Sequence, residues 1–161
     1  MKRLILVRHG KSSWKYDLPD DKRPLKKRGI NDAHLVSGLF KKEKIPIDKV
    51  ISSPAVRAFS TCKIFLKNLG IESEKVEIEQ NLYDFQGENV IEIIKKCPGK
   101  YNTIMIFGHN HAFTSISNIF GSKLIDNLPT SGLLMIELNI NVWQDLKKGD
   151  TKLTIFPKDF K

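Results

Sequence analysis

The stretch Arg3-Leu4-Ile5-Leu6-Val7-Arg8-His9-Gly10 joins a short apolar run to a guanidinium, an imidazole and a glycine. Four consecutive aliphatic residues between charged ones are typical of a short strand buried inside a sheet. The run is too short for the apolar segment of a signal peptide and far too short to span a bilayer. We therefore expect a cytoplasmic protein with this strand in its core.

The rest of the chain alternates between strand-like and helix-like patterns, which indicates an α/β sheet in one domain over residues 1–161. Ser53 and Pro54 resemble an N-cap followed by proline at the first helical position, and Gly70 is placed to end that helix. Further strands are expected at residues 49–52, 75–79, 103–107, 133–138 and 152–156, and helices at residues 29–43, 54–69, 88–96 and 111–120.

Composition narrows the classes of function. The two cysteines, Cys62 and Cys97, lie far apart, which suits free thiols in a reducing compartment. The net charge is +9, and the first 50 residues carry fourteen Lys and Arg against six Asp and Glu. This excess either attracts an anionic substrate or acidic partner, or is a solvated lysine-rich surface. Aromatic residues do not alternate with the basic ones, so we do not expect nucleic-acid binding.

Three short segments follow predicted strands and carry reactive side chains. They are Arg8-His9-Gly10, the run from Ser52 to Arg57, and Gly108-His109-Asn110-His111. Ligands of open α/β sheets bind at the carboxyl ends of the strands, so these segments can converge on one pocket. Guanidinium forks and a helix N-terminus suit phosphate oxygens, and an unprotonated imidazole nitrogen can act as a nucleophile.

Other phosphate chemistries lack their signatures. No glycine is followed at the P-loop spacing by Gly-Lys-Ser or Gly-Lys-Thr. The residue six positions after Cys97 is Thr103, where a cysteine phosphatase loop would need arginine. No histidine and carboxylate cluster has metal-ligand spacing, so we expect neither metal nor cofactor.

On these residues the sequence resembles the histidine phosphatase (phosphoglycerate mutase-like) superfamily, and its short bacterial phosphohistidine phosphatase (SixA-type) branch in particular. The similarity covers nearly the whole chain. Its motifs are RHGKSSW (Arg8–Trp14), DDKRPLKKRG (Asp20–Gly29), SSPAVRAFST (Ser52–Thr61), GHNH (Gly108–His111) and, more loosely, LPTSG (Leu128–Gly132). The resemblance implies a three-layer α/β/α fold with a mostly parallel central sheet.

The resemblance also implies roles for individual residues. His9 would be the nucleophile and form a phosphohistidine intermediate, Arg8 and Arg57 would bind the phosphoryl oxygens, and His109 would stabilise their charge. We expect the wider substrate contacts to come from Gly10, Lys11, Ser12, Arg23 and Asn110. Arg23, like Lys26, either forms a positive rim for a phosphoprotein or, through Asp20, ties down its own loop.

The proton donor remains open at this point. Asp84 stands where many superfamily members have a glutamate, and Glu88 is a more distant candidate. His111 replaces a proline common in the superfamily, and either begins the next helix or supplies a proton. An imidazole leaving group, with a pKa near 6.5, would need little help from an acid.

The expected function is removal of phosphate from phosphohistidine in a signalling phosphoprotein, such as a histidine-containing phosphotransfer domain. The alternatives are a phosphomonoesterase for small phosphorylated metabolites and a phosphate-binding module without activity. Both histidines and both arginines are present, which argues against the non-catalytic alternative.

Overall fold

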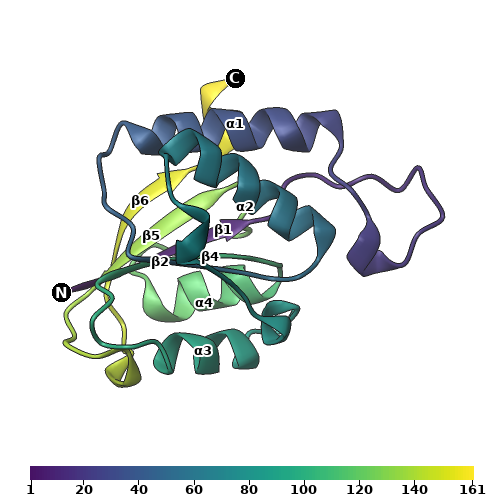
Figure 1. The fold of residues 1–161 in the computed structure, drawn as a ribbon. Helices are drawn as coiled ribbons and strands as arrows, with labels where there is room; N and C mark the ends of the chain where they lie inside the picture. Colours follow the sequence, from purple (N-terminus) through teal and green to yellow (C-terminus); the bar gives the residue numbers. More distant parts are fainter.

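The computed structural model describes residues 1–161 and contains one six-stranded sheet in the order β3-β2-β4-β1-β5-β6 (Figure 1). The four strands from β3 to β1 pair in parallel, and β5 and β6 add two antiparallel pairings at one side. The predicted mostly parallel sheet is confirmed. The strands are β1 (Lys2–Arg8), β2 (Lys49–Ser52), β3 (Val76–Ile78), β4 (Thr103–Gly108), β5 (Leu133–Leu138) and β6 (Asp150–Ile155).

Helices cover both faces of this sheet, which confirms the three-layer arrangement. Figure 1 shows α1 and α2 on one face and α3 and α4 on the other. The helices are α1 (Lys27–Lys41), α2 (Val56–Leu69), α3 (Glu88–Lys95) and α4 (Ala112–Phe120). None of them is both long enough and apolar enough to cross a membrane.

Successive side chains of β1 point to opposite faces of the sheet, which explains why its apolar run is continuous. Leu4 and Leu6 point to the side of α3 and α4, while Ile5 and Val7 point to the side of α1 and α2, and all four are fully buried. A central strand between two helical layers needs apolar side chains on both faces. Leu4 and Leu6 pack in a core that includes Ile94, Phe113 and Ile116, and Ile5 and Val7 pack in one that includes Val36, Phe40 and Phe65.

Two helix starts were predicted wrongly by two residues, because α1 begins at Lys27 where residue 29 was expected, and α2 begins after the expected Pro54. α2 begins at Val56 with Ala55 as its N-cap, and no side chain caps it. Ser53 lies two residues too early for that task, and its hydroxyl accepts a bond from the Ala55 N–H (3.2 Å) within the turn. The C-terminal prediction for the same helix is confirmed, because Gly70 adopts a left-handed φ of 67°.

Candidate active site

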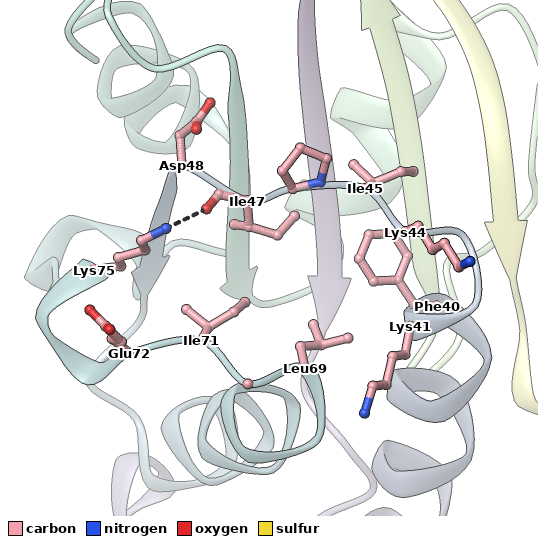
Figure 2. A pocket seen from close by; sticks show the side chains of 12 residues that line it. Phe40, Lys41, Lys44, Ile45, Ile47, Asp48, Leu69, Ile71, Glu72 and Lys75 are labelled. Atoms are coloured by element: carbon pink, nitrogen blue, oxygen red, sulfur yellow. Dashed lines mark hydrogen bonds between the residues drawn. The ribbon is translucent and has the colours of Figure 1, made fainter.

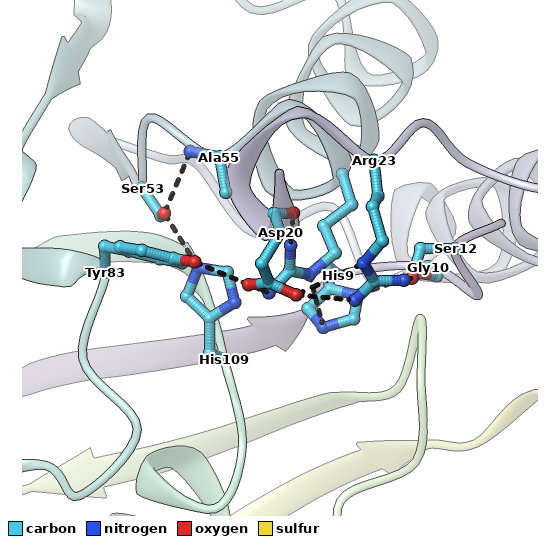
Figure 3. Close-up of polar contacts among 10 residues, drawn as sticks. His9, Gly10, Ser12, Asp20, Arg23, Ser53, Ala55, Tyr83 and His109 are labelled. Atoms are coloured by element: carbon cyan, nitrogen blue, oxygen red, sulfur yellow. Dashed lines mark hydrogen bonds and ion pairs between the residues drawn. The ribbon is translucent and has the colours of Figure 1, made fainter. Parts of the chain in front are cut away.

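The segments singled out by their sequence meet at the carboxyl edge of the sheet. β4 lies between β2 and β1, and Arg8 at the end of β1 is level with Gly108 at the end of β4. His9, Ser53 and His109 therefore follow three neighbouring parallel strands at the edge where α/β folds bind ligands. Figure 3 shows His9 and His109 among the polar side chains gathered there.

His9 presents an unprotonated nitrogen to this site. Its Nδ1 is 2.7 Å from the Gly10 carbonyl oxygen, which can only accept, so Nδ1 carries the proton and Nε2 is unprotonated. Burial lowers the pKa of His9 to about 3; the bond to Gly10 opposes this, while the charges of Arg57, Arg8 and Arg23 lower it further. The Arg57 Nε donates a long hydrogen bond to Nε2 (3.4 Å). His9 is therefore a neutral imidazole at physiological pH.

His109 lies beside His9 with one unpaired nitrogen. The two ring centroids are 5.3 Å apart, and the His109 side chain is fully buried. Its Nε2 is 2.8 Å from the Ser53 hydroxyl, which has no other acceptor and therefore donates to Nε2. This bond places the proton on Nδ1, which is buried without a partner. Burial, before all other causes, lowers the pKa of His109 to about 3, so the unpaired Nδ1–H is a neutral donor.

Asp20 joins two guanidinium groups at the mouth of the site (Figure 3). Arg57 donates from Nη1 to the Asp20 carbonyl oxygen (2.6 Å) and from Nη2 to Oδ2 (2.9 Å). Arg23 donates from Nε and Nη2 to Oδ1 (3.2 and 3.0 Å), and its Nη1 donates to Ser12. The Tyr83 hydroxyl donates to Oδ2. Of the two roles considered for Arg23, the structure therefore shows the tie through Asp20.

These contacts keep Asp20 ionised. Burial alone would raise its pKa, but the hydrogen bonds from Tyr83, Arg57 and Arg23 outweigh burial and lower the pKa to about 2. A carboxylate with such a pKa carries no proton to donate at neutral pH. Asp20 instead fixes the direction of both guanidinium groups.

Arg8 contributes a second unpaired donor. Its Nη1 donates to the Leu128 carbonyl oxygen (2.9 Å), while its Nε is buried without a partner. Burial and the nearby charge of Arg57 lower its pKa from the usual value. Buried donors without partners are uncommon in folded proteins, so Arg8 Nε and His109 Nδ1 mark where a ligand oxygen would be accommodated.

These groups surround a pocket of about 490 Å³. Most of the site residues predicted from sequence line this pocket, but His109 and Gly10 do not. The N–H of Gly10 donates to the Thr61 hydroxyl (2.9 Å), which holds the turn that follows His9. The lining residues are Arg8, His9, Lys11, Ser12, Trp14, Asp20, Arg23, Arg57, Phe85, Asn110 and Thr130.

The structure does not support Asp84 as the proton donor. Its carboxylate accepts four backbone N–H groups at the start of α3, from Gln86, Gly87, Asn89 and Val90 (3.0–3.2 Å), and it does not line the pocket. A carboxylate near a helix N-terminus is favoured by the helix dipole, which accounts for its place.

The other two candidate acids also lie outside the pocket lining. Glu88 is the exposed first residue of α3. His111 is the exposed N-cap residue of α4, which agrees with the first of its two predicted roles, the start of the next helix.

Sequence reasoning missed Ser53 and Tyr83. Ser53 follows β2 at the edge where His9 follows β1, so its position in a neighbouring strand end was a usable signal. Tyr83 lies 63 residues from Asp20 in the chain, and nothing local to either residue announces their contact.

A second cavity lies at the opposite end of the sheet (Figure 2). It measures about 410 Å³ and is bordered by the C-terminal ends of α1 and α2 and by the segment before β2. Its lysines and carboxylates include Lys41, Lys44, Glu72 and Lys75, but it contains no histidine, cysteine or arginine. It lies away from the edge at which the predicted site residues meet.

The geometry at the carboxyl edge suits a tetrahedral anion. The unprotonated Nε2 of His9 accepts a hydrogen bond from a guanidinium group, and the buried Arg8 Nε and His109 Nδ1 have no partner. No group of three or more His, Cys, Asp or Glu side chains is arranged to hold a metal ion. The protein's own residues supply the positive charge that phosphoryl oxygens need.

Comparison with known proteins agrees with this geometry. The family model for the histidine phosphatase superfamily (branch 1) matches residues 4–119. An uncharacterized protein of Mycobacterium tuberculosis is 27% identical over 160 residues, covering 93% of this chain and 98% of the relative.

Solved structures share the fold. The protein histidine phosphatase SixA complexed with tungstate superposes with a TM-score of 0.84 at 18% identity, covering 99% of both chains. SixA from Agrobacterium tumefaciens gives a TM-score of 0.76 at 22% identity, covering 84% of this chain and 91% of the other. At these identities the likeness concerns the fold alone.

Proposed function

This chain belongs to the histidine phosphatase superfamily, and we propose that it removes phosphate from phosphohistidine in a phosphoprotein through a phosphohistidine intermediate on His9. The coarser conclusion, phosphatase activity, follows from the family. The finer one concerns the substrate and the residues that act on it.

The observation that carries the proposal is the state of His9. Its Nδ1–H is held by the Gly10 carbonyl, and its unprotonated Nε2 accepts only a long hydrogen bond from the Arg57 Nε (3.4 Å), which an incoming phosphoryl oxygen would take over. A nucleophile needs the Nε2 lone pair at neutral pH, and burial, which lowers the pKa of His9 to about 3, favours the unprotonated form.

Two displacements at phosphorus complete the reaction. The His9 Nε2 attacks phosphorus, and the N–P bond breaks in a substrate phosphohistidine that is protonated on its other ring nitrogen; the electron pair of that bond stays on the substrate ring, which leaves as a neutral imidazole. Water then attacks phospho-His9, the bond between Nε2 and phosphorus breaks, and inorganic phosphate and a neutral His9 remain. Such transfers depend on positioning and on neutralising oxygen charge.

Arg8, Arg57 and His109 supply that neutralisation. The unpaired Nε of Arg8 and the unpaired Nδ1–H of His109 would donate to phosphoryl oxygens, and Arg57 would bind a third oxygen next to His9. Donors that are already fixed need no reorganisation in the transition state.

The absence of a usable acid in the pocket favours an N–P bond over an ester. Asp20 is the one carboxylate that lines the pocket, and its pKa of about 2 leaves it without a proton. An alkoxide leaving group requires protonation by the enzyme, whereas a phosphohistidine already protonated on its other ring nitrogen releases a neutral imidazole, whose conjugate acid has a pKa near 6.5.

Side chains around the pocket favour a protein substrate. Lys11, Ser12, Arg23 and Asn110 line it and would contact groups beyond the phosphoryl oxygens. Residues 11–28 carry seven Lys and Arg against three Asp. We infer that an acidic surface around the phosphohistidine, as on a phosphotransfer domain, would dock against this segment.

The test follows the phosphoryl group. A phosphotransfer domain labelled with radioactive phosphate on histidine is mixed with the wild-type protein and quenched in alkaline detergent, which preserves N–P bonds. We expect label on the peptide that contains His9. His9→Asn should abolish both labelling and phosphate release, and His109→Asn should slow release by about 10²–10³-fold.

His34→Asn is the matched control, because His34 is an exposed histidine of α1 that bonds Asn68 and lies outside the site. Labelling of the His9→Asn variant, or a clear preference for sugar or nucleotide phosphates, would overturn the proposal. Activity that disappears with a chelator would also contradict it.

A further inference from the structure

Two aromatic side chains stand apart in the otherwise polar pocket. Of its 11 lining residues only Trp14 and Phe85 are hydrophobic. We propose that these two rings form a subsite for a planar aromatic leaving group, so that the site prefers phosphoryl groups carried on an imidazole or aryl ring to those on saturated carbons. This inference rests on the proposed function, because the leaving group that the subsite would hold is that of the proposed reaction in the same pocket.

Trp14 is exposed yet held in place. Its side chain is 74% exposed, and the Arg23 guanidinium lies 3.6 Å from its ring centroid. Arg23 itself is only 6% exposed and is fixed by its bonds to Asp20 and Ser12. One face of the indole is therefore stacked on a rigid partner, and the remaining surface is open to a ligand.

Phe85 reaches the pocket from a different loop, between the Tyr83 turn and α3. It is 44% exposed, and its ring makes edge contacts with Tyr83 (5.1 Å between centroids) and His109 (5.2 Å). Its position is thus set by residues of the site. When a ligand covers an exposed aromatic ring, the apolar surface that is buried contributes to the binding free energy.

The direction of the reaction places the leaving group near these rings. His9 is 8% exposed, whereas Trp14 and Phe85 are far more exposed, so His9 lies deeper in the pocket. In-line displacement puts the leaving group opposite the attacking Nε2, and therefore toward the mouth. An imidazole ring there can stack on an aromatic face, and a protonated one gains a cation–π attraction as well.

A saturated leaving group fits the same place poorly. The hydroxyl groups of a sugar would meet aromatic faces that offer no hydrogen bond, and they would lose their water on binding. The subsite thus discriminates by ring chemistry, while the arginines below recognise the phosphoryl oxygens common to all substrates.

Binding of two matched probes tests this subsite without turnover. Benzylphosphonate and cyclohexylmethylphosphonate carry the same charge and a six-membered ring, one flat and one saturated. By calorimetry the wild-type protein should bind the aromatic probe about tenfold more tightly. Trp14→Leu and Phe85→Leu should each reduce this ratio at least threefold, while inorganic phosphate binds with nearly unchanged affinity.

Tyr16→Leu is the control, because Tyr16 is an exposed aromatic residue (54%) of the same loop that does not line the pocket. It should keep the wild-type ratio. Trp14→Phe, which retains a ring to stack on Arg23, should keep most of it. Equal binding of the two probes by the wild type, or a full ratio in both leucine variants, would overturn the subsite.

The outcomes separate this inference from the proposed function. If His9 never becomes labelled while the aromatic preference and its dependence on Trp14 are found, the phosphohistidine mechanism fails and the subsite stands. If labelling occurs but the probes bind equally, the subsite fails and the mechanism stands.

Discussion

Burial holds the pKa of His9 and of His109 at about 3, whereas imidazoles of the unfolded chain titrate near 6.5. A lowered pKa means that protons bind preferentially to the unfolded state, so stability falls as the pH drops below 6.5. Between about pH 7 and about pH 5 each histidine should remove about 2 kcal/mol, or about 4 kcal/mol together, from the free energy of unfolding. Urea denaturation at these two pH values measures it.

Substitution assigns that pH dependence to its source. His9→Asn should remove about half of the loss between the two pH values, and His34→Asn should leave most of it in place. A wild-type stability that is flat over this interval would mean that the two imidazoles are not held neutral by the fold.

Asp20 sets the geometry of two arginines, and its loss should impair catalysis. In Asp20→Ala both Arg57 and Arg23 lose their common acceptor. Because a displacement of about 1 Å can cost about 10²-fold in rate, we expect kcat/KM to fall by roughly 10- to 100-fold. Steady-state kinetics with a phosphohistidine substrate provide the measurement.

Two further variants identify the effect as one of positioning. Asp20→Asn keeps an acceptor oxygen and should recover part of the lost kcat/KM, whereas Asp21→Ala should behave as wild type because Asp21 makes no contact with the arginines. Activity of Asp20→Ala equal to that of the wild type would show that Arg57 is oriented without it.

The first turn of α1 supports the loop that follows the nucleophile. A Cβ on Gly29 would lie 2.3 Å from the Lys11 carbonyl oxygen, so Gly29→Ala must push α1 and that loop apart. We expect a loss of about 1–3 kcal/mol in unfolding free energy, as for other overpacked sites, together with reduced kcat/KM. Thermal denaturation and steady-state kinetics measure the two effects.

The same helix contains its own control. Gly38 is exposed, and a Cβ there would meet nothing within 4 Å. Gly38→Ala should therefore stabilise the protein by about 0.5–1 kcal/mol without changing kcat/KM. Equal effects of the two substitutions would contradict the steric account of Gly29.

The elements themselves could be predicted because their signals are local. The apolar runs gave β1, β2, β4 and β5 nearly within their bounds, since a buried strand reads as continuous aliphatic residues. The function of Ser53 could not be predicted in this way. A serine before a proline resembles a cap, and only the neighbouring strand end reveals that it faces His109.

The part of the site that could be predicted is the part that follows from strand order. His9 and His109 end neighbouring strands, so an α/β reading already places them together. The contact of Tyr83 with Asp20 and the capping bonds of Asp84 depend on how long loops fold over the edge of the sheet. Such loops have no hydrophobic periodicity. The sequence alone therefore cannot distinguish a carboxylate that caps a helix from one that faces a pocket.

The two ends of the sheet also divide function from stability. The carboxyl end of the sheet carries the unpaired donors of the site. The amino end carries a buried lysine whose ammonium group makes three hydrogen bonds. Lys2, at the start of β1, is 2% exposed and lies 5.9 Å from the centre of the Trp143 ring. It therefore offers a way to change stability without touching the reaction.

Lys2→Met should destabilise the whole molecule and leave its chemistry intact. The Lys2 ammonium donates to the carbonyl oxygens of Gly99 and Tyr101 and to the Asn102 side chain, and methionine would fill the space without donating. The Tyr101 carbonyl oxygen keeps its bond from the Trp143 indole N–H, and Gly99 and Asn102 are exposed to water, so the loss of these bonds should cost about 1–2 kcal/mol, which lowers Tm by about 2–8 °C in a chain of this size. Exposed Lys100, changed to Met, should leave Tm within about 2 °C of the wild type.

Because β1 runs from Lys2 at one end of the sheet to the nucleophile at the other, kcat/KM of Lys2→Met, measured well below Tm, should stay within about twofold of wild type. A large loss of kcat/KM in a folded Lys2→Met protein would show instead that the two ends are coupled through the strand.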